Sequence, residues 1–322
     1  MKHRITAIVI LLSMAVGFLA GCGEEIGSSG LAQGEWPVRI TAVLPHTDQG
    51  YWTDVGDAIS ARAKELGADA KVVTPQLNYN VPQMVDMIRQ AIAAQTDALI
   101  VQGIDDPDYR AALADAAAQG ILVVLVDTDL PDDFEHLYVG TDNYDAGVQM
   151  GERLIEISGG RAVVAVMSGA PGYPNLDERV AGLRDAVAGY PGIEIRRVDY
   201  NEYDTLTALE TYNRILSEDP DVDTLICVEG TGGQTVGLML NPENCSLKNI
   251  LVFDLAEESV AGAKNGLIDG IMAQQQKEMG SIAVEEILRH VEQGSYSAQK
   301  HYTPVVFYTQ RQLEEGVADE LI

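Results

Sequence analysis

Carboxylate side chains stand directly after three short apolar runs, at positions where they could bind a ligand. Asp127 follows ILVVLV, Glu229 follows DTLICV and Asp254 follows NILVF. A carboxylate accepts hydrogen bonds from two adjacent hydroxyl groups, and each charge-assisted bond contributes roughly 1.5–3 kcal/mol. These residue types therefore indicate binding of a small polar molecule.

Donors and aromatic rings occupy comparable positions elsewhere in the chain. Arg and Gln side chains donate to hydroxyl or ring oxygens, and flat aromatic rings cover the C–H faces of a pyranose or furanose. Each residue alone has a simpler explanation, such as a helix cap, a core aromatic or a solvated charge. Their convergence after successive strands favours a binding site. The further candidates are the donors and aromatic residues Gln49, Tyr51, Trp52, Arg179 and Gln274, together with the carboxylate of Asp48.

The elements that must position these residues alternate regularly from Val38 onward. Short apolar runs (VRITAVL, AKVVT, DALIVQ, ILVVLV) are separated by helical patterns over residues 53–66, 82–94 and 107–119. Such alternation predicts a parallel sheet covered by helices on both faces. Ligands of open α/β sheets bind beyond the carboxyl ends of the strands, where the candidates stand.

The same order of elements then repeats in the second half of the chain. RAVVAVM (161–167), a helical stretch over 175–188, IEIRRV, TLTALETYNRILSE and DTLICVEG follow one another as in the first half. The runs DALIVQG and DTLICVEG begin at Asp97 and Asp223. We therefore predict an α/β protein with two similar lobes, each a parallel β-sheet flanked by helices.

The amino terminus predicts export and lipid anchoring. Residues 1–21 contain a basic start and an apolar stretch, and LAGC ends at Cys22 as in a lipobox. The apolar run is shorter than the roughly 20 residues that a membrane span needs. We expect a signal peptide over 1–21, lipidation of Cys22 and a flexible tether over 22–37. The location is then extracytoplasmic, at the periplasm or the outer face of the cell membrane.

Composition excludes several other functions. The formal net charge of −28 opposes binding to nucleic acid. Five scattered histidines form no metal-ligand spacing, so neither a metal nor a cofactor is expected. GTGGQTVG (230–237) lacks the third glycine of a dinucleotide fingerprint, and nothing singles out the paired carboxylates of a glycosidase. Cys227 and Cys245 could form a disulfide, but a buried free thiol at Cys227 is the favoured interpretation.

Several motifs, in order, resemble the type I periplasmic sugar-binding proteins of the ribose-binding kind. They are HTDQGYWTDVGDAISARAKELG, VVLVDTD, YVGTDNYDAGVQMG, NLDERVAGL, ILVFDLAEESVAGAKNG and GIMAQQQKEMGSIAVE. The resemblance implies that Tyr51 and Trp52 stack on a sugar beside a polar contact from Gln49. It assigns further ligand contacts to Asp127, Arg179, Asp254 and Gln274.

Two departures from that family pattern bear on the ligand. Thr128 stands where ribose binders carry Arg, and Glu229-Gly230 replaces a neutral Asn followed by Asp. Thr128 and Glu229 therefore join the candidate contacts, which now include three carboxylates, Asp127, Glu229 and Asp254, against one cation, Arg179. This balance suits a ligand rich in hydroxyl donors, or one carrying an amino group, better than ribose.

The resemblance also implies the division of the chain and its role. Residues 38–141 plus 275–304 would form the first lobe, and residues 142–274 plus 305–322 the second. The chain would cross between them near Thr141, Gln274 and Val305. We expect a monomeric, non-enzymatic binding protein that delivers a sugar or polyol to an ABC permease. The alternative is a receptor whose closed form is presented to a membrane histidine kinase or chemoreceptor.

Overall fold

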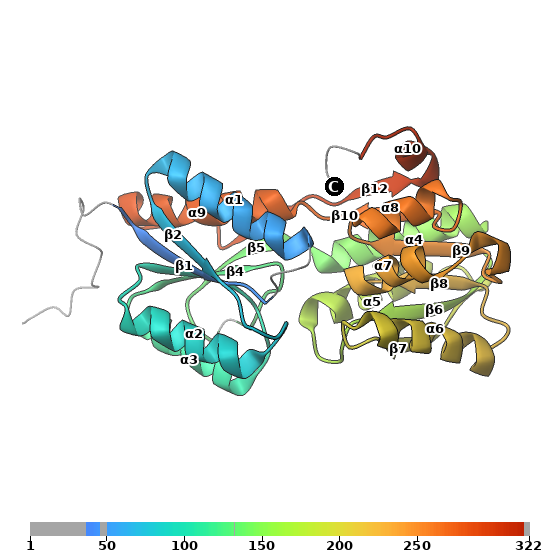
Figure 1. Cartoon of the computed structure of the whole chain (residues 1–322), viewed down its shortest axis with the longest axis horizontal. Helices are drawn as coiled ribbons and strands as arrows, with labels where there is room; N and C mark the ends of the chain where they lie inside the picture. Colours follow the sequence, from blue (N-terminus) through green and yellow to red (C-terminus); the bar gives the residue numbers. More distant parts are fainter. Residues whose placement is uncertain (1–36, 46–49, 132, 319–322) are drawn as a thin grey trace, which may run out of the picture.

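A computed structural model describes residues 37–45, 50–131 and 133–318, and contains two six-stranded sheets (Figure 1). In the first, the strand order is β11-β5-β4-β3-β1-β2, and all neighbouring strands are parallel. The strands are β1 (Arg39–Val43), β2 (Asp69–Val73), β3 (Ala98–Gln102), β4 (Leu122–Val126), β5 (Leu137–Thr141) and β11 (Lys300–Thr303).

The second sheet has the corresponding order, β12-β10-β9-β8-β6-β7. Its edge strand β12 runs antiparallel to β10, whereas the other pairs are parallel. The two-lobed α/β fold predicted from the repeated pattern is thereby confirmed. The strands are β6 (Ala162–Ser168), β7 (Ile193–Tyr200), β8 (Thr224–Cys227), β9 (Asn249–Phe253), β10 (Gly270–Ala273) and β12 (Val306–Thr309).

Helices flank both sheets, and their starts follow local capping signals. The patterns at 82–94 and 107–119 correspond to helices that begin after Asn80 and Asp106, whose side chains accept from backbone N–H groups of the first turn. The helix expected at 53–66 begins earlier, at Gly50. The helices are α1 (Gly50–Leu66), α2 (Val81–Ala93), α3 (Pro107–Ala118), α4 (Asn143–Ser158), α5 (Pro174–Val187), α6 (Thr205–Glu218), α7 (Gly230–Met239), α8 (Glu257–Lys264), α9 (Gln276–Gln293) and α10 (Gln310–Glu314).

Each sheet is buried on both faces, which explains the almost uninterrupted apolar strands. All residues of β3 and β8 are buried, and separate apolar clusters lie on the two sides of each sheet. Burying one such aliphatic side chain contributes about 1.5–3 kcal/mol. The carboxyl ends of the strands consequently carry most of the polar residues that the sheets can present to a ligand.

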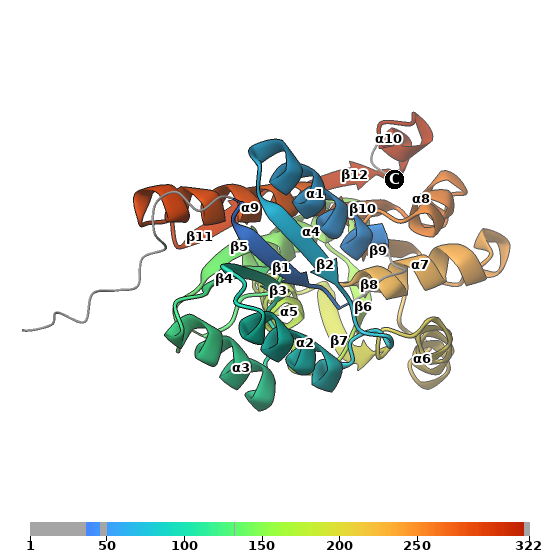
Figure 2. The ribbon, with the colours of Figure 1, turned by 60° about the vertical axis from the view of Figure 1, so that its left-hand side comes forward.

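Within the described residues, the chain passes between the two sheets three times. It crosses after β5, again between β10 and α9, and finally between β11 and β12. Figures 1 and 2 show α9 beside α1 at the first sheet, although the two helices are far apart in sequence. We propose lobe boundaries at these crossings: residues 38–141 plus 275–304, and residues 142–274 plus 305–322.

Both internal cysteines are free thiols. Cys227 is fully buried in β8, and Cys245 lies 3.7 Å from the hydroxyl group of Tyr212. Cys22, the predicted lipidation site, lies outside the described residues. Among the described helices, none has the length and apolarity needed to traverse a bilayer.

Candidate functional site

A cavity of about 420 Å³ lies between the carboxyl ends of the two sheets. Seven predicted residues line it: Tyr51, Trp52, Asp127, Arg179, Glu229, Asp254 and Gln274. Asp48 and Gln49 lie outside the described residues. Thr128 is fully buried but does not line the cavity, since its hydroxyl group donates to Asp127 (2.6 Å). In the structure Thr128 therefore positions that carboxylate, and a direct contact of Thr128 with a ligand stays a prediction.

Asp127 and Asp254 occupy equivalent positions in the two lobes. They directly follow β4 and β9, the third strand of each sheet order, and have φ values of 69° and 68°. The backbone N–H of Asp127 donates to Val139 in β5, and that of Asp254 donates to Met272 in β10. Asp tolerates this left-handed conformation better than most residues, and the turn directs both carboxylates to the cavity.

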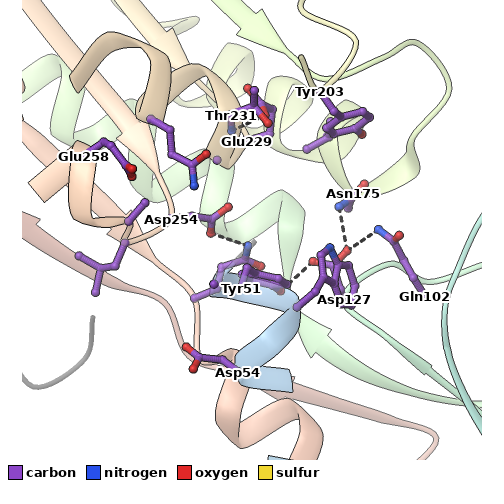
Figure 3. A pocket seen from close by; sticks show the side chains of 18 of the residues that line it. Tyr51, Asp54, Gln102, Asp127, Asn175, Tyr203, Glu229, Thr231, Asp254 and Glu258 are labelled. Atoms are coloured by element: carbon purple, nitrogen blue, oxygen red, sulfur yellow. Dashed lines mark hydrogen bonds between the residues drawn. The ribbon is translucent and has the colours of Figure 1, made fainter. Parts of the chain in front are cut away.

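Asp127 is surrounded by neutral hydrogen-bond donors (Figure 3). Its Oδ2 accepts from the hydroxyl group of Tyr51 (2.8 Å). Its Oδ1 accepts from Thr128 and from the side-chain amides of Gln102 (3.0 Å) and Asn175 (3.3 Å). Asn175 belongs to α5 of the second lobe, so this carboxylate is held by groups from both lobes. Burial, together with the nearby charge of Asp127, raises the pKa of Tyr51 well above its ordinary value and keeps it a donor.

Asp254 has far fewer hydrogen-bond partners than Asp127 among the described residues. Its Oδ1 accepts from Nε2 of Gln274 (2.8 Å), whose Oε1 accepts from the hydroxyl group of Thr141 (2.8 Å). These two hydrogen bonds connect Asp254 to Gln274 and Thr141, which lie at two of the places where the polypeptide crosses between the lobes. Burial raises the pKa of Asp254, and the opposing effects of Arg179 and Gln274 are smaller.

Arg179 is the cation among the described residues that line the cavity, and it is only 2% exposed. Its guanidinium group lies 4.3 Å from the ring centroid of Phe253. Nε donates to Oδ1 of Asn143 (2.9 Å) and Nη1 to the carbonyl of Val228 (2.8 Å). Nη2 is buried without a hydrogen-bond partner among the described residues. Nη2 of Arg179 is thus held rigidly at the cavity and remains available to donate a hydrogen bond to a ligand.

Glu229 has a structural role that its sequence position did not distinguish from ligand binding. Its carboxylate accepts from the backbone N–H groups of Thr231 and Gly232, both at 2.7 Å, and so caps α7. It also accepts from the side-chain amide of Asn201 (2.7 Å). Burial still raises the pKa of Glu229, although these bonds oppose that effect. Glu229 lines the cavity, but much of its hydrogen-bonding capacity is already used.

Aromatic residues on both lobes meet beside the cavity. Trp52 is 3% exposed and its indole N–H donates to the hydroxyl group of Tyr79 (3.3 Å). The Tyr79 ring stacks on Tyr203 of the second lobe, with centroids 4.7 Å apart and planes inclined by 17°. Tyr173 meets both rings edge to face. This cluster joins the lobes directly.

The sequence prediction omitted Tyr79, Gln102, Asn175 and Tyr203, which also line the cavity. Gln102 ends β3, and the two tyrosines lie in the loops after β2 and β7, the corresponding edge strands of the two sheets. Applying the rule of strand ends to every strand would have selected Gln102. Tyr79 and Tyr203 both adopt a positive φ of 55°. The surrounding sequence does not predict this backbone conformation.

The Tyr79→Ala substitution should weaken ligand binding about two- to tenfold. It removes the stack on Tyr203, and such aromatic pairs contribute about 0.5–1.5 kcal/mol beyond their buried area. Loss of this contact between lobes should also expand the ligand-free protein, as measured by small-angle scattering. Tyr190→Ala, at an exposed position, is the control. Unchanged affinity and dimensions in Tyr79→Ala would show that the stack does not hold the lobes together.

Proteins of known role resemble this chain over nearly all of its described length. The ribose import binding protein RbsB of Bacillus subtilis strain 168 is 24% identical over 289 residues, which are 87% of this chain and 91% of RbsB. Among solved structures, GanP, a glucose-galactose binding protein from Geobacillus stearothermophilus, has a TM-score of 0.82 at 28% identity. That similarity covers 87% of this chain and 99% of GanP.

A second solved structure is that of an ABC transporter solute-binding protein from Burkholderia graminis in complex with D-arabinose. Its TM-score is 0.80 at 25% identity. The similarity covers 87% of this chain and 98% of the Burkholderia protein. A family model described as the periplasmic binding protein domain matches residues 40–295. The chain therefore belongs to the family of periplasmic binding protein domains.

Proposed function

We propose that this protein is the solute-binding component of an ABC importer and captures one monosaccharide-sized ligand between its lobes. The observation that carries the proposal is a set of buried polar atoms around the cavity without hydrogen-bond partners among the described residues: Oε1 of Gln102, Oδ1 of Asn175 and Nη2 of Arg179. Buried polar groups are nearly always hydrogen-bonded. A ligand rich in hydroxyl groups would satisfy all three.

The cavity and its relatives support this class of ligand. Its volume of about 420 Å³ falls toward the lower end of small-molecule sites, which span roughly 300–1,000 Å³. RbsB and GanP are named for sugars. Asp127, Arg179 and Gln274 are fixed by neighbouring side chains, which suits recognition of a rigid ring. The proposed activity is binding and release, without catalysis.

The proposed location is outside the cytoplasm, with Cys22 lipidated and residues 22–37 acting as a tether. The family assignment supports an extracytoplasmic location. Closure of the lobes around a ligand would present a changed surface to the membrane permease. The proposed functional unit is the monomer, in which both lobes of the chain contribute to the cavity.

Thermal unfolding of the purified protein with a panel of pentoses, hexoses, amino sugars and polyols tests the binding function. A ligand at 100 times its dissociation constant adds about 2.7 kcal/mol to the free energy of unfolding. We expect a clear rise in Tm with at least one member of the panel. A folded protein that responds to none of them would contradict the proposal.

Uptake by cells distinguishes import from sensing. Deleting the gene should abolish high-affinity accumulation of the stabilising ligand from the medium. Normal accumulation combined with a lost transcriptional response would contradict the importer role and support a receptor for a membrane sensor. The Cys22→Ala variant, measured in the same cells, tests whether anchoring is needed.

Trp52 should report ligand binding through its fluorescence. The indole lines the cavity and is held by Tyr79, so closure around a ligand changes its surroundings. The ligand-induced change in tryptophan emission should be lost in Trp52→Phe, and the affinity should fall. Trp36, the second tryptophan of the chain, provides the comparison: Trp36→Phe should retain the signal. A signal that persists in Trp52→Phe would place the responding indole elsewhere.

A further inference from the structure

The two sides of the cavity differ in how their carboxylates are satisfied. Figure 3 shows Asp127 with Gln102 and Asn175 on one side, and Asp254 with Glu258 on the other. Asp127 accepts from four neutral donors. Asp254 accepts from Gln274 alone, and Glu258 has no partner in the described part of the chain. The side of Asp254 and Glu258 is therefore poor in donors and negatively charged.

The side of Asp127 presents acceptors to a ligand. An ionised carboxylate only accepts hydrogen bonds, so the NH₂ groups of Gln102 and Asn175 must face Asp127. Their carbonyl oxygens have no partner in the part of the chain that the structure describes, although both residues are more than nine-tenths buried. The bonds to Asp127 thus fix the orientation of both amides, whose carbonyl oxygens remain as acceptors for a ligand.

The side of Asp254 presents further acceptors. Oδ2 of Asp254 has no protein partner in the described residues, and it lies so close to Gly230 that a Cβ there would be 3.3 Å away. Glu258, in the first turn of α8, is partly buried and lines the same cavity. The positive end of that helix dipole favours a carboxylate there. The first turn of α8 supplies no hydrogen bond to the side chain of Glu258 in the described residues.

The described cations compensate this charge only in part, through the attraction of Arg179 to Asp254. Arg179 donates to the neutral oxygens of Asn143 and Val228. Lys277 lies 3.3 Å from Asp54, another carboxylate of the cavity wall, and pairs with it. Asp254 and Glu258 have no ion pair among the described residues. Both side chains are only partly buried, but charges withdrawn from water are costly unless they are paired.

We infer that the ligand carries a cationic amino group in addition to hydroxyl groups, and that Asp254 and Glu258 receive that group. This inference rests on the proposed binding function and specifies its ligand class as amino sugars or amino polyols. An ammonium group has three donors and no acceptor, which matches the unpartnered oxygens. Nη2 of Arg179 supplies the complementary donor for a hydroxyl or ring oxygen of the same molecule.

Matched pairs of ligands test the inference. Isothermal titration at neutral pH compares each 2-amino-2-deoxy sugar with its parent hydroxyl sugar, and each amino polyol with its parent polyol. We expect at least one amino compound to bind ten times more tightly than its parent. Parent compounds that bind equally well or better would overturn the inference and leave the proposed function standing. If a folded protein binds neither series, the proposed function fails as well.

A charge-neutral variant tests the assigned residue. Glu258→Gln keeps the size of the side chain and should reduce affinity for the amino ligand about tenfold, and by more than for its parent. Glu152→Gln makes the same change of charge at an exposed position of α4 outside the cavity, and should bind as the unmodified protein does. Equal melting temperatures would establish that both variants fold. An undiminished amino preference in Glu258→Gln would overturn the assignment.

Discussion

Replacing Asp254 with Asn should weaken ligand binding at least a hundredfold while making the ligand-free protein more stable at neutral pH. Binding falls because the carboxylate loses its charge, and charge-assisted bonds contribute about 1.5–3 kcal/mol each. Stability rises because Asp254 is partly buried with a single hydrogen-bond partner in the described residues, and its pKa is raised by desolvation. The amide retains the geometry of the bond from Gln274.

The pH dependence of this effect has a definite sign. A raised pKa means that the folded protein binds the proton of Asp254 more tightly than the unfolded chain does. The free energy of unfolding therefore decreases as pH rises from the ordinary Asp pKa, about 3.9, through the raised pKa of the folded state. The asparagine side chain of the Asp254→Asn variant does not titrate, so the variant should lack this decrease.

Denaturant unfolding without ligand, measured across this pH range, tests the prediction. The difference in stability between Asp254→Asn and the unmodified protein should grow with pH and favour the variant at pH 7. Taking the difference removes the contribution of Glu229, whose pKa is also raised. A variant less stable than the unmodified protein at pH 7 would mean that attraction to Arg179 outweighs the cost of burial.

Replacing Asp127 with Ala should abolish binding and also destabilise the protein, by about 3 kcal/mol. The carboxylate is the shared acceptor of Tyr51, Gln102, Thr128 and Asn175. Leaving a buried donor without an acceptor costs about 1–3 kcal/mol, and some of these groups will find other partners or water. The left-handed backbone conformation, with φ of 69°, adds strain for Ala.

Denaturant unfolding of Asp127→Ala and Asp127→Asn measures this cost. Asn retains one acceptor and tolerates the left-handed conformation, so it should lose less stability than Ala while still losing affinity. Equal stability of Asp127→Ala and the unmodified protein would contradict the network described above. Together with Asp254→Asn, these variants should show that equivalent positions in the two lobes have opposite effects on stability.

Sequence patterns predicted the fold well because both sheets are buried on two faces. Continuous apolar strands and intervening helical patterns are direct consequences of that burial, and they repeat in both lobes. The positions of Asp127 and Asp254 followed from the rule that ligands meet the carboxyl ends of strands. Both carboxylates do line the cavity.

Individual roles within the site could not be predicted in the same way. The interpretation of Glu229 as a ligand contact or a cap depends on Asn201 and on the first turn of α7, which only the folded chain brings together. The stack of Tyr79 on Tyr203 depends on two loops from different lobes. Such contacts leave no periodic pattern in the sequence.

The passage of the chain between the sheets also has a consequence for the order of folding. The first sheet is built mainly from residues 39–141, but β11 and α9 come from the end of the chain. Met279, Val284 and Ile287 of α9 complete the apolar cluster that contains Ile40 and Ile59. Until those residues have been synthesised, this cluster stays incomplete and β5 has an open edge. Pairing over such sequence separations is slow, so the lobe that begins first along the chain should finish folding among the last parts of the molecule.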